Sequence, residues 1–301
     1  MQHSENAVAA KARAAFGRML TSSQYDELLR KQSVQEISAY LREHTAYAQA
    51  LEGVQDSAIH RGRLETLLRR DLFYQYARLT HYVPGAGAGD IYGYIVPDME
   101  IELILSALRV IISGSGDLLA ALPSFMQSYA RFDFVALAQA KTLDGLIEAV
   151  RATPYEAILR ACREQYPPQG GSLRFTRYEV ALRTYYFESM LLRAARAPKH
   201  AAKQLSGLIR MRAELMNLNT IFRMKTYFNA DAGRIRATLL PYHWRIRPRQ
   251  MQAMIEAKDT PAFMKLLSQT ALGRQINPQA AFIELETERV RYHETLRTLR
   301  F

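Results

Sequence analysis

Three polar side chains on one predicted helix are the first candidates for chemistry in this sequence. Arg210, Glu214 and Asn217 recur at i, i+4 and i+7, within the arc that Ile221 and Phe228 define on the helix surface. Polar groups on an apolar face predict buried hydrogen bonds to neighbouring segments. The alternative is an exposed Arg210–Glu214 pair, which stabilises a helix by about 0.3–0.5 kcal/mol. We take the three residues as a candidate structural polar cluster.

A second group of polar and aromatic side chains lies in a loop further along the chain. It consists of Tyr242, Trp244, Arg245, Arg247 and Arg249. Trp, Tyr and Arg are the residue types that contribute most to protein interfaces, so this loop is a candidate partner-binding surface. The alternative is a loop whose Trp packs inward and whose arginines are solvated.

Patterns that enzymes and nucleotide-binding proteins use are missing from the sequence. No two of the 7 histidines have zinc-ligand spacing, and there is no Gly-x-Ser-x-Gly motif. The alternating glycines at 84–90 lack the Gly-Lys-Ser/Thr end of a phosphate loop and follow a helical segment, which indicates a flexible connection. We therefore expect no catalytic residue, no cofactor, no metal site and no direct nucleotide contact.

The composition indicates a globular and basic protein. Its 301 residues are 49% hydrophobic, and 40 basic residues against 29 acidic ones give a net charge of +11. The two charges are interleaved, which favours solvated helix surfaces, and an acidic protein partner or anionic lipid head groups account for the excess as well as nucleic acid does. The apolar run at 101–112 is interrupted by Glu102 and Arg109 and is too short to cross a bilayer. A single cysteine and the absence of a signal-peptide pattern in residues 1–20 predict a cytoplasmic location.

Helices are expected to position all of these residues. Apolar periodicity, caps and prolines predict long helices near 58–81, 98–113, 177–193 and 210–228 and at the end of the chain. Pairs or groups of short helices are predicted at 19–51, 122–160 and 251–270. The only alternation typical of a strand is the arginine series at 245–249, and a loop explains it equally well. The predicted fold class is all-α.

One layout occurs three times in the sequence. A Ser or Thr cap, a short amphipathic helix and a final Thr recur at 33–45, 142–153 and 260–270. Two long helices also correspond, because 100–109 and 214–223 each begin with Glu and end with Arg. Three helical repeats with boundaries at 1–92, 93–205 and 206–301 account for this pattern.

Several stretches together resemble a known family. They are TSSQYDELLRKQSVQEISAYLREHTAYAQAL, DMEIELILSALR, and RAELMNLNTIFRMKTYFN followed by LLPYHW. They are similar to the C subunit of the bacterial and archaeal V-type (A-type) rotary ATPases, which is related to the d subunit of vacuolar ATPases. The family pattern in the third stretch matches Glu214, Asn217, Leu218, Arg223 and Lys225. In the second stretch Leu103 and Leu105 stand where the corresponding Asn would be expected.

The resemblance carries expectations about fold and function. It implies a funnel of three similar helical lobes, which agrees with the sequence repeat. It also implies a non-catalytic central-stalk subunit, cytoplasmic and peripheral to the cell membrane, that acts as a socket between the rotating shaft and the membrane proteolipid ring. Contact with anionic lipid head groups is a further expectation. A different class of protein, a basic helical RNA-binding or scaffold protein, is the alternative, and it predicts nucleic-acid affinity that falls steeply with salt.

Overall fold

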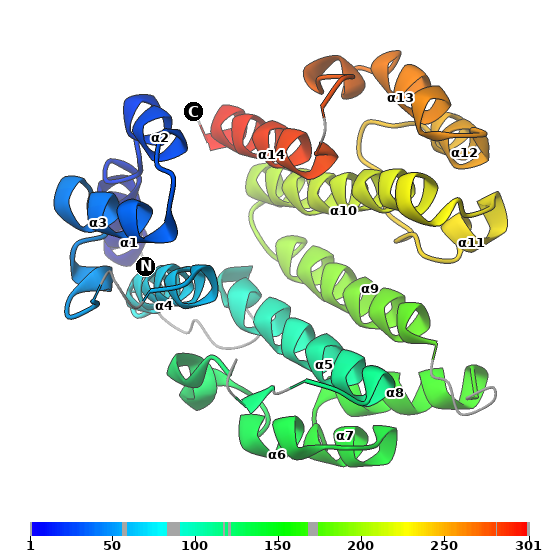
Figure 1. Cartoon of the computed structure of the whole chain (residues 1–301), viewed down its shortest axis with the longest axis horizontal. Coiled ribbons are helices and arrows are strands. Elements are labelled where there is room, and N and C mark those ends of the chain that lie inside the picture. The colour runs from blue at the N-terminus through cyan, green and yellow to red at the C-terminus, as the bar shows by residue number, and fades with distance from the viewer. Residues whose placement is uncertain are drawn as a thin grey trace. The chain divides into compact units, whose positions relative to one another are not determined.

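The computed structural model describes residues 2–55, 59–82, 91–116, 118–119, 122–167, 174–280 and 282–299. Within these ranges every regular element is a helix and none is a strand, as predicted (Figure 1). The alternating glycines at 84–90 fall outside the described residues, as does most of the second glycine- and proline-containing segment, at 168–173.

The contacts between residues divide the chain into two compact units. One unit contains Met1–Met99 and Leu119–Phe134, and the other contains Glu100–Leu118 and Val135–Phe301. The division into three lobes at 1–92, 93–205 and 206–301 stays a prediction.

The first unit has a small apolar core under short helices. Leu41, Leu51, Ile59, Leu64 and Leu67 are its buried members. The elements are α1 (Gln2–Phe16), α2 (Ser22–Leu29), α3 (Val34–His44), η1 (Gln49–Leu51), α4 (Arg61–Thr80), η3 (Ile91–Tyr94) and η5 (Ser124–Tyr129).

Hydroxyl side chains cap the starts of α2 and α3. The Ser33 hydroxyl accepts the N–H of Glu36, but the Glu36 carboxylate accepts from the N–H of Gln32 instead of returning to Ser33. The reciprocal capping box occurs at α2, where Thr21 accepts from the N–H of Gln24 and the Gln24 side chain accepts from the N–H of Thr21. Local side-chain chemistry therefore determines where both helices begin.

The second unit contains the longer helices. Its elements are α5 (Ile95–Ser113, which starts in the first unit), α6 (Phe134–Gln139), α7 (Leu143–Ala149), α8 (Pro154–Gln165), α9 (Phe175–Ala194), α10 (Lys199–Phe228), α11 (Ala232–Arg236), α12 (Pro248–Glu256), α13 (Thr260–Ser268), η6 (Gly273–Gln275) and α14 (Ile283–Leu299). The predicted helix at 210–228 starts earlier, at Lys199, because no proline lies between Pro198 and Arg210.

Helix α10 is the element against which the C-terminal part of the second unit is packed. It contacts α9, α14, α13 and α11, and Figure 1 shows it between α9 and α14. Its buried residues Met211, Leu215, Leu218, Ile221 and Phe222 belong to one apolar cluster with the buried residues of α12, α13 and α14. Burial on more than one side explains why apolar residues occupy most of its circumference.

The three threonines that end the repeated short helices make the same contact. The Thr153 hydroxyl donates to the carbonyl of Val150 at 2.6 Å, and that of Thr270 donates to the carbonyl of Leu267 at 2.7 Å. The Thr45 hydroxyl donates to the carbonyl of Leu41. Each hydroxyl donates to a carbonyl at the C-terminal end of its helix, and the carbonyls of Val150 and Leu267 also accept the backbone N–H of the same threonine.

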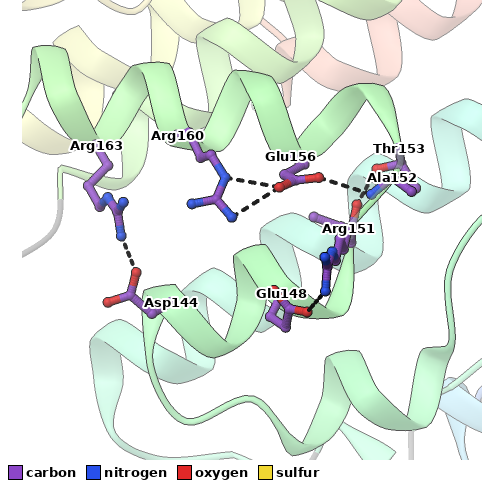
Figure 2. A network of polar contacts seen from close by, with 9 residues as sticks. Asp144, Glu148, Arg151, Ala152, Thr153, Glu156, Arg160 and Arg163 are labelled. Atoms are coloured by element: carbon purple, nitrogen blue, oxygen red, sulfur yellow. Dashed lines mark hydrogen bonds and ion pairs between the residues drawn. The ribbon is translucent and has the colours of Figure 1, made fainter.

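Further polar contacts hold the turn between α7 and α8, which contains Thr153 (Figure 2). Glu156 accepts from the backbone N–H of Ala152 at 2.9 Å and pairs with Arg160, while Arg163 reaches back to Asp144. Ala152 has a positive φ of 59°, which is uncommon for a residue other than glycine. The Glu156 hydrogen bond therefore holds a tight turn in place.

Candidate functional site

The carboxyl group of Glu214 lies inside the protein and binds the backbone of a distant loop. Glu214 is 0% exposed, and its two oxygens accept N–H groups from Trp244 at 2.7 Å, from Arg245 at 3.1 Å, and from Ile246 at 3.1 and 3.3 Å. A carboxylate has enough lone pairs for three such donors. One side chain of α10 thus fixes three consecutive peptide groups.

Asn217, one helical turn later, binds the same loop at a second point. It is 2% exposed. Its amide donates to the carbonyl of Leu240 at 2.9 Å and accepts from the N–H of Leu240 at 2.8 Å. Because both polar groups of the Asn217 side chain are engaged, a loop shifted by one residue would lose this pair of hydrogen bonds.

The structure differs from the prediction at Arg210. This residue is exposed, and among the described residues Glu214 forms no ion pair with it. Arg210 does lie one helical turn before Glu214, but the Glu214 oxygens accept peptide N–H groups of the loop instead of pairing with Arg210. The buried cluster on α10 consists of Glu214 and Asn217 without Arg210.

The two aromatic residues of the loop face the interior of their own unit. The Tyr242 hydroxyl donates to the carbonyl of Thr184 at 3.2 Å, its ring centroid lies 5.7 Å from that of Phe187, and burial raises its pKa. Trp244 is partly buried and packs on the apolar cluster around α10, beside Gly207. The structure therefore matches the inward-packed alternative for these two side chains.

Arg245 connects the loop to α14. Its guanidinium forms a bidentate pair with Glu294 of α14, with N–O distances of 2.9 and 3.0 Å. The Cζ atom of the same guanidinium lies 4.0 Å from the centroid of the Trp244 ring. The Glu294 side chain is only 4% exposed and also accepts from Gln275 at 3.2 Å. Burial alone would raise the pKa of the Glu294 carboxyl, but the hydrogen bonds from Arg245 and Gln275 outweigh it and hold that pKa below its ordinary value.

Arg247 and Arg249 have different surroundings from Arg245. Both are exposed, at the N-terminal end of α12. The backbone N–H of Arg247 donates to the Gln250 side chain at 3.0 Å. The structure thus separates the predicted residues into two inward-packed aromatic side chains, Arg245 with its ion pair, and two arginines directed to solvent. The partner-binding role stays a prediction.

Comparison with known protein families gives a match over nearly the whole chain. The model of the family described as ATP synthase (C/AC39) subunit matches residues 8–299. The chain belongs to this family.

Curated relatives in the ATP synthase (C/AC39) subunit family are distant from this chain. The A-type ATP synthase C subunit of Methanosphaera stadtmanae is 22% identical over 276 residues, which is 88% of this chain and 65% of that protein. The corresponding protein of Thermococcus kodakarensis is 24% identical over 77% of this chain and 60% of its own length. That of Methanothermobacter thermautotrophicus is 22% identical over 89% of this chain and 66% of its own length. The chain spans slightly less than two thirds of the length of the relatives it matches.

Two residues of the site, Glu294 and Lys225, were not predicted from the types and spacing of residues in the sequence. Glu294 lies 49 positions after Arg245, and no local pattern links them. Lys225 matched the family pattern only by position. Its ammonium group donates to the carbonyls of Ile255, at 2.9 Å, and Ala257, and so caps the C-terminal end of α12. Burial lowers the pKa of Lys225.

Two other kinds of site are missing from the part of the chain that the structure describes. In these ranges no group of three or more His, Cys, Asp or Glu side chains could hold a metal ion. Among the same residues, no helix is both long and apolar enough to span a bilayer.

Proposed function

We propose that this protein is a non-catalytic central-stalk subunit of a V/A-type rotary ATPase. It would act as a socket that couples the rotating central shaft to the membrane proteolipid ring during ATP-linked ion transport. The observation that carries the proposal is the family match over residues 8–299, together with relatives named as C subunits of A-type ATP synthases. The partners, the peripheral position at the cytoplasmic side of the cell membrane and contact with anionic head groups belong to the same proposal.

The internal contacts support a mechanical role. A part that transmits torque has to keep its helices and loops in register under load. The Glu214 and Asn217 hydrogen bonds hold the loop at 240–246 on α10 at two places, and the Arg245–Glu294 pair connects that loop to α14. These contacts are directional, and those of Glu214 and Asn217 are buried, so they oppose sliding more effectively than apolar packing alone. A funnel of three lobes, with the boundaries given above, is the arrangement that we propose for the repeats.

The experiment that tests the function is affinity purification of the tagged chain from detergent-solubilised membranes of the source cells. We expect to recover shaft and proteolipid-ring subunits of a rotary ATPase, identified by mass spectrometry. The matched control is a tagged Glu214→Ala variant, which we expect to misfold locally and to recover less. Recovery of RNA or unrelated soluble proteins by the unaltered chain, without ATPase subunits, would contradict the proposal.

A basic helical RNA-binding or scaffold protein remains the second candidate because of the net charge of +11. It predicts RNA binding whose affinity falls steeply between low and physiological salt. The inward packing of Tyr242 and Trp244 counts against it, since these rings are not free to stack on bases. A filter-binding titration with poly(U) at two salt concentrations distinguishes the two candidates.

A further inference from the structure

Helix α14 has apolar side chains on two opposite sides. Ile283 and Val290 are buried in the apolar cluster around α10. Leu285 and Tyr292, two positions after each of them, are 68% and 46% exposed. With 3.6 residues per turn, this offset of two positions places the exposed pair on the side of the helix that faces away from the cluster. One apolar side of α14 is therefore covered by its own unit and the other is open.

The open side carries apolar residues at a regular spacing. Phe282, which is 61% exposed, immediately precedes the helix, and Leu296 is partly buried near its end. With Leu285, Arg289 and Tyr292 between them, these residues follow one another at intervals of 3, 4, 3 and 4 positions. We call Phe282, Leu285, Tyr292 and Leu296 the α14 stripe. Alternating intervals of 3 and 4 are the pattern by which two helices pack along each other, so the stripe fits another helix.

Arg289 is the one polar residue in this spacing, and its charge is compensated within the same unit. Its guanidinium pairs with Glu286 at 2.8 Å and donates to the carbonyl of Gln275 at 3.1 Å. The aliphatic part of an arginine side chain can line an apolar contact while its charged end stays in water. Arg289 therefore interrupts the stripe without placing an uncompensated charge in it.

The charged residues beside the stripe are divided by sign along the helix. The acidic residues of the first half are Glu284, Glu286 and Glu288. The second half has exposed Arg291 and Arg297, and its one acid, Glu294, is buried and bound to Arg245. Two such helices side by side in parallel would bring like charges together. In an antiparallel pair the acidic half of each helix lies beside the basic half of the other.

A second copy of this chain fits both the spacing and the charges. It carries the same stripe, and a twofold axis reverses the order of its charges, as a self-complementary contact requires. Antiparallel packing of this spacing places Leu285 against Leu296 of the partner subunit, and Arg289 against Tyr292 of the partner subunit. A surface of anionic lipid fits less well, because the three glutamates at one end of the stripe would be repelled.

We propose that the α14 stripe is the contact surface between two copies of this chain, with the two α14 helices antiparallel. The inference concerns the free chain and does not rest on the proposed function. Because α14 has 17 residues, or about five turns, the contact is small, and the dimer should dissociate on dilution.

The first test is sedimentation equilibrium of the full-length chain at concentrations from about 1 to 100 µM. The stripe variant combines Leu285→Gln with Tyr292→Gln. The matched control combines Leu192→Gln with Tyr227→Gln, which removes the same residue types from positions on α9 and α10 that are 62% and 61% exposed. Circular dichroism verifies that the helical content of all three proteins is equal.

We expect the average mass of the unaltered chain to rise with concentration from one chain toward two. The dissociation constant should increase about tenfold or more in the stripe variant and by about twofold or less in the control. A monomer at every concentration would overturn the proposal and leave the stripe to a different protein or a lipid surface. Equal losses in the two variants would indicate non-specific apolar association and would also overturn it.

Disulfide cross-linking tests the orientation of the two helices. Leu285→Cys and Leu296→Cys are prepared as separate variants and oxidised singly and as a mixture, while the native Cys162 is buried and common to both. The antiparallel arrangement predicts cross-linked dimers mainly in the mixture, since it brings position 285 of one copy to position 296 of the other. Cross-linking of each variant with itself, at the same yield as the mixture, would contradict the antiparallel arrangement.

Discussion

Two glutamates at corresponding places in the second and third sequence repeats are both completely buried, and both accept hydrogen bonds from residues far away in the sequence. Glu100 of α5 and Glu214 of α10 are each 0% exposed, and each precedes an arginine by nine positions. Glu100 accepts the Tyr155 hydroxyl of α8 at 2.7 Å, whereas Glu214 accepts backbone N–H groups of the loop before α12. Each buried acid therefore connects its long helix to a segment that is distant in the sequence.

The arginines that follow these glutamates also differ. The Arg109 guanidinium lies 5.0 Å from the centroid of the Phe175 ring at the start of α9, whereas Arg223 is exposed and has no ring or ion-pair partner among the described residues. The repeated sequence pattern thus preserves the helix and its buried acid, while the surroundings of the arginine differ between the two repeats. Changes at these positions can test how different the two glutamates are.

The largest effect is expected for Glu214→Ala. The substitution leaves three backbone N–H groups buried without an acceptor, and removal of one partner from such a buried polar site typically costs about 3–5 kcal/mol. Urea unfolding followed by circular dichroism measures the loss in the free energy of unfolding. Glu164→Ala, at an exposed position on α8, is the control and should change it by less than about 0.5 kcal/mol. A loss below about 1 kcal/mol at Glu214 would show that the loop is held mainly by packing.

Asn217→Ala should have the next largest effect, about 2–3 kcal/mol, because both hydrogen bonds to the buried Leu240 peptide are lost. Asn219→Ala is a matched control two positions later, where the amide oxygen accepts a single hydrogen bond from Thr287. We expect Asn219→Ala to lower the free energy of unfolding by about 1 kcal/mol. Hydrogen exchange should also show faster exchange of the Leu240 and Trp244 amides in Asn217→Ala, and equal exchange in the two variants would contradict a specific hold on the loop.

Tyr155→Phe tests the Glu100 side of the comparison. The change removes one donor to a buried carboxyl group and leaves the ring in place, so we expect a loss of about 1–1.5 kcal/mol in the free energy of unfolding. Tyr185→Phe is the control, because its ring lies 6.0 Å from that of Tyr155 and its hydroxyl makes no hydrogen bond among the described residues. If Tyr155→Phe lowered the free energy of unfolding as much as Glu214→Ala does, the single Tyr155 hydrogen bond would stabilise the fold as much as all the hydrogen bonds of Glu214.

The smallest expected effect is the loss of the Arg245–Glu294 ion pair at acid pH. The pKa of Glu294 is held below its ordinary value of 4.5, so its ion pair stabilises the fold fully above pH 4.5 and is lost as the pH falls through the lower pKa of the folded state. The Arg245 side chain is 38% exposed, so we expect a contribution of about 0.5–1 kcal/mol. Urea titrations of the unaltered protein and Glu294→Gln between pH 7 and pH 3 should show a stability difference that shrinks below about pH 4.5. A difference independent of pH would argue against this role for Glu294.

Local sequence patterns were sufficient for the helices and many of their ends. The apolar spacing of Met211, Leu215, Leu218 and Phe222 predicted α10, and the hydroxyl at Ser33 predicted the start of α3. These features depend on residues within one or two helical turns of each other, so a single stretch of sequence contains all the information they need. The family resemblance was likewise carried by short stretches of residues.

The partners of polar side chains were decided by the tertiary structure. Helical spacing placed Arg210 beside Glu214 on an apolar face, but the peptide groups of residues 244–246 occupy the Glu214 oxygens, and Arg210 is exposed. Glu294 could not be assigned to Arg245 from the sequence, since it lies 49 positions further along and any of several exposed acids would have been an equally good candidate. The sequence by itself determined an all-α chain and indicated one candidate buried acid, Glu214, on a long helix. Which groups such acids bind depends on how helices distant in the chain pack, because hydrogen bonds act over about 3 Å and local patterns do not specify such positions.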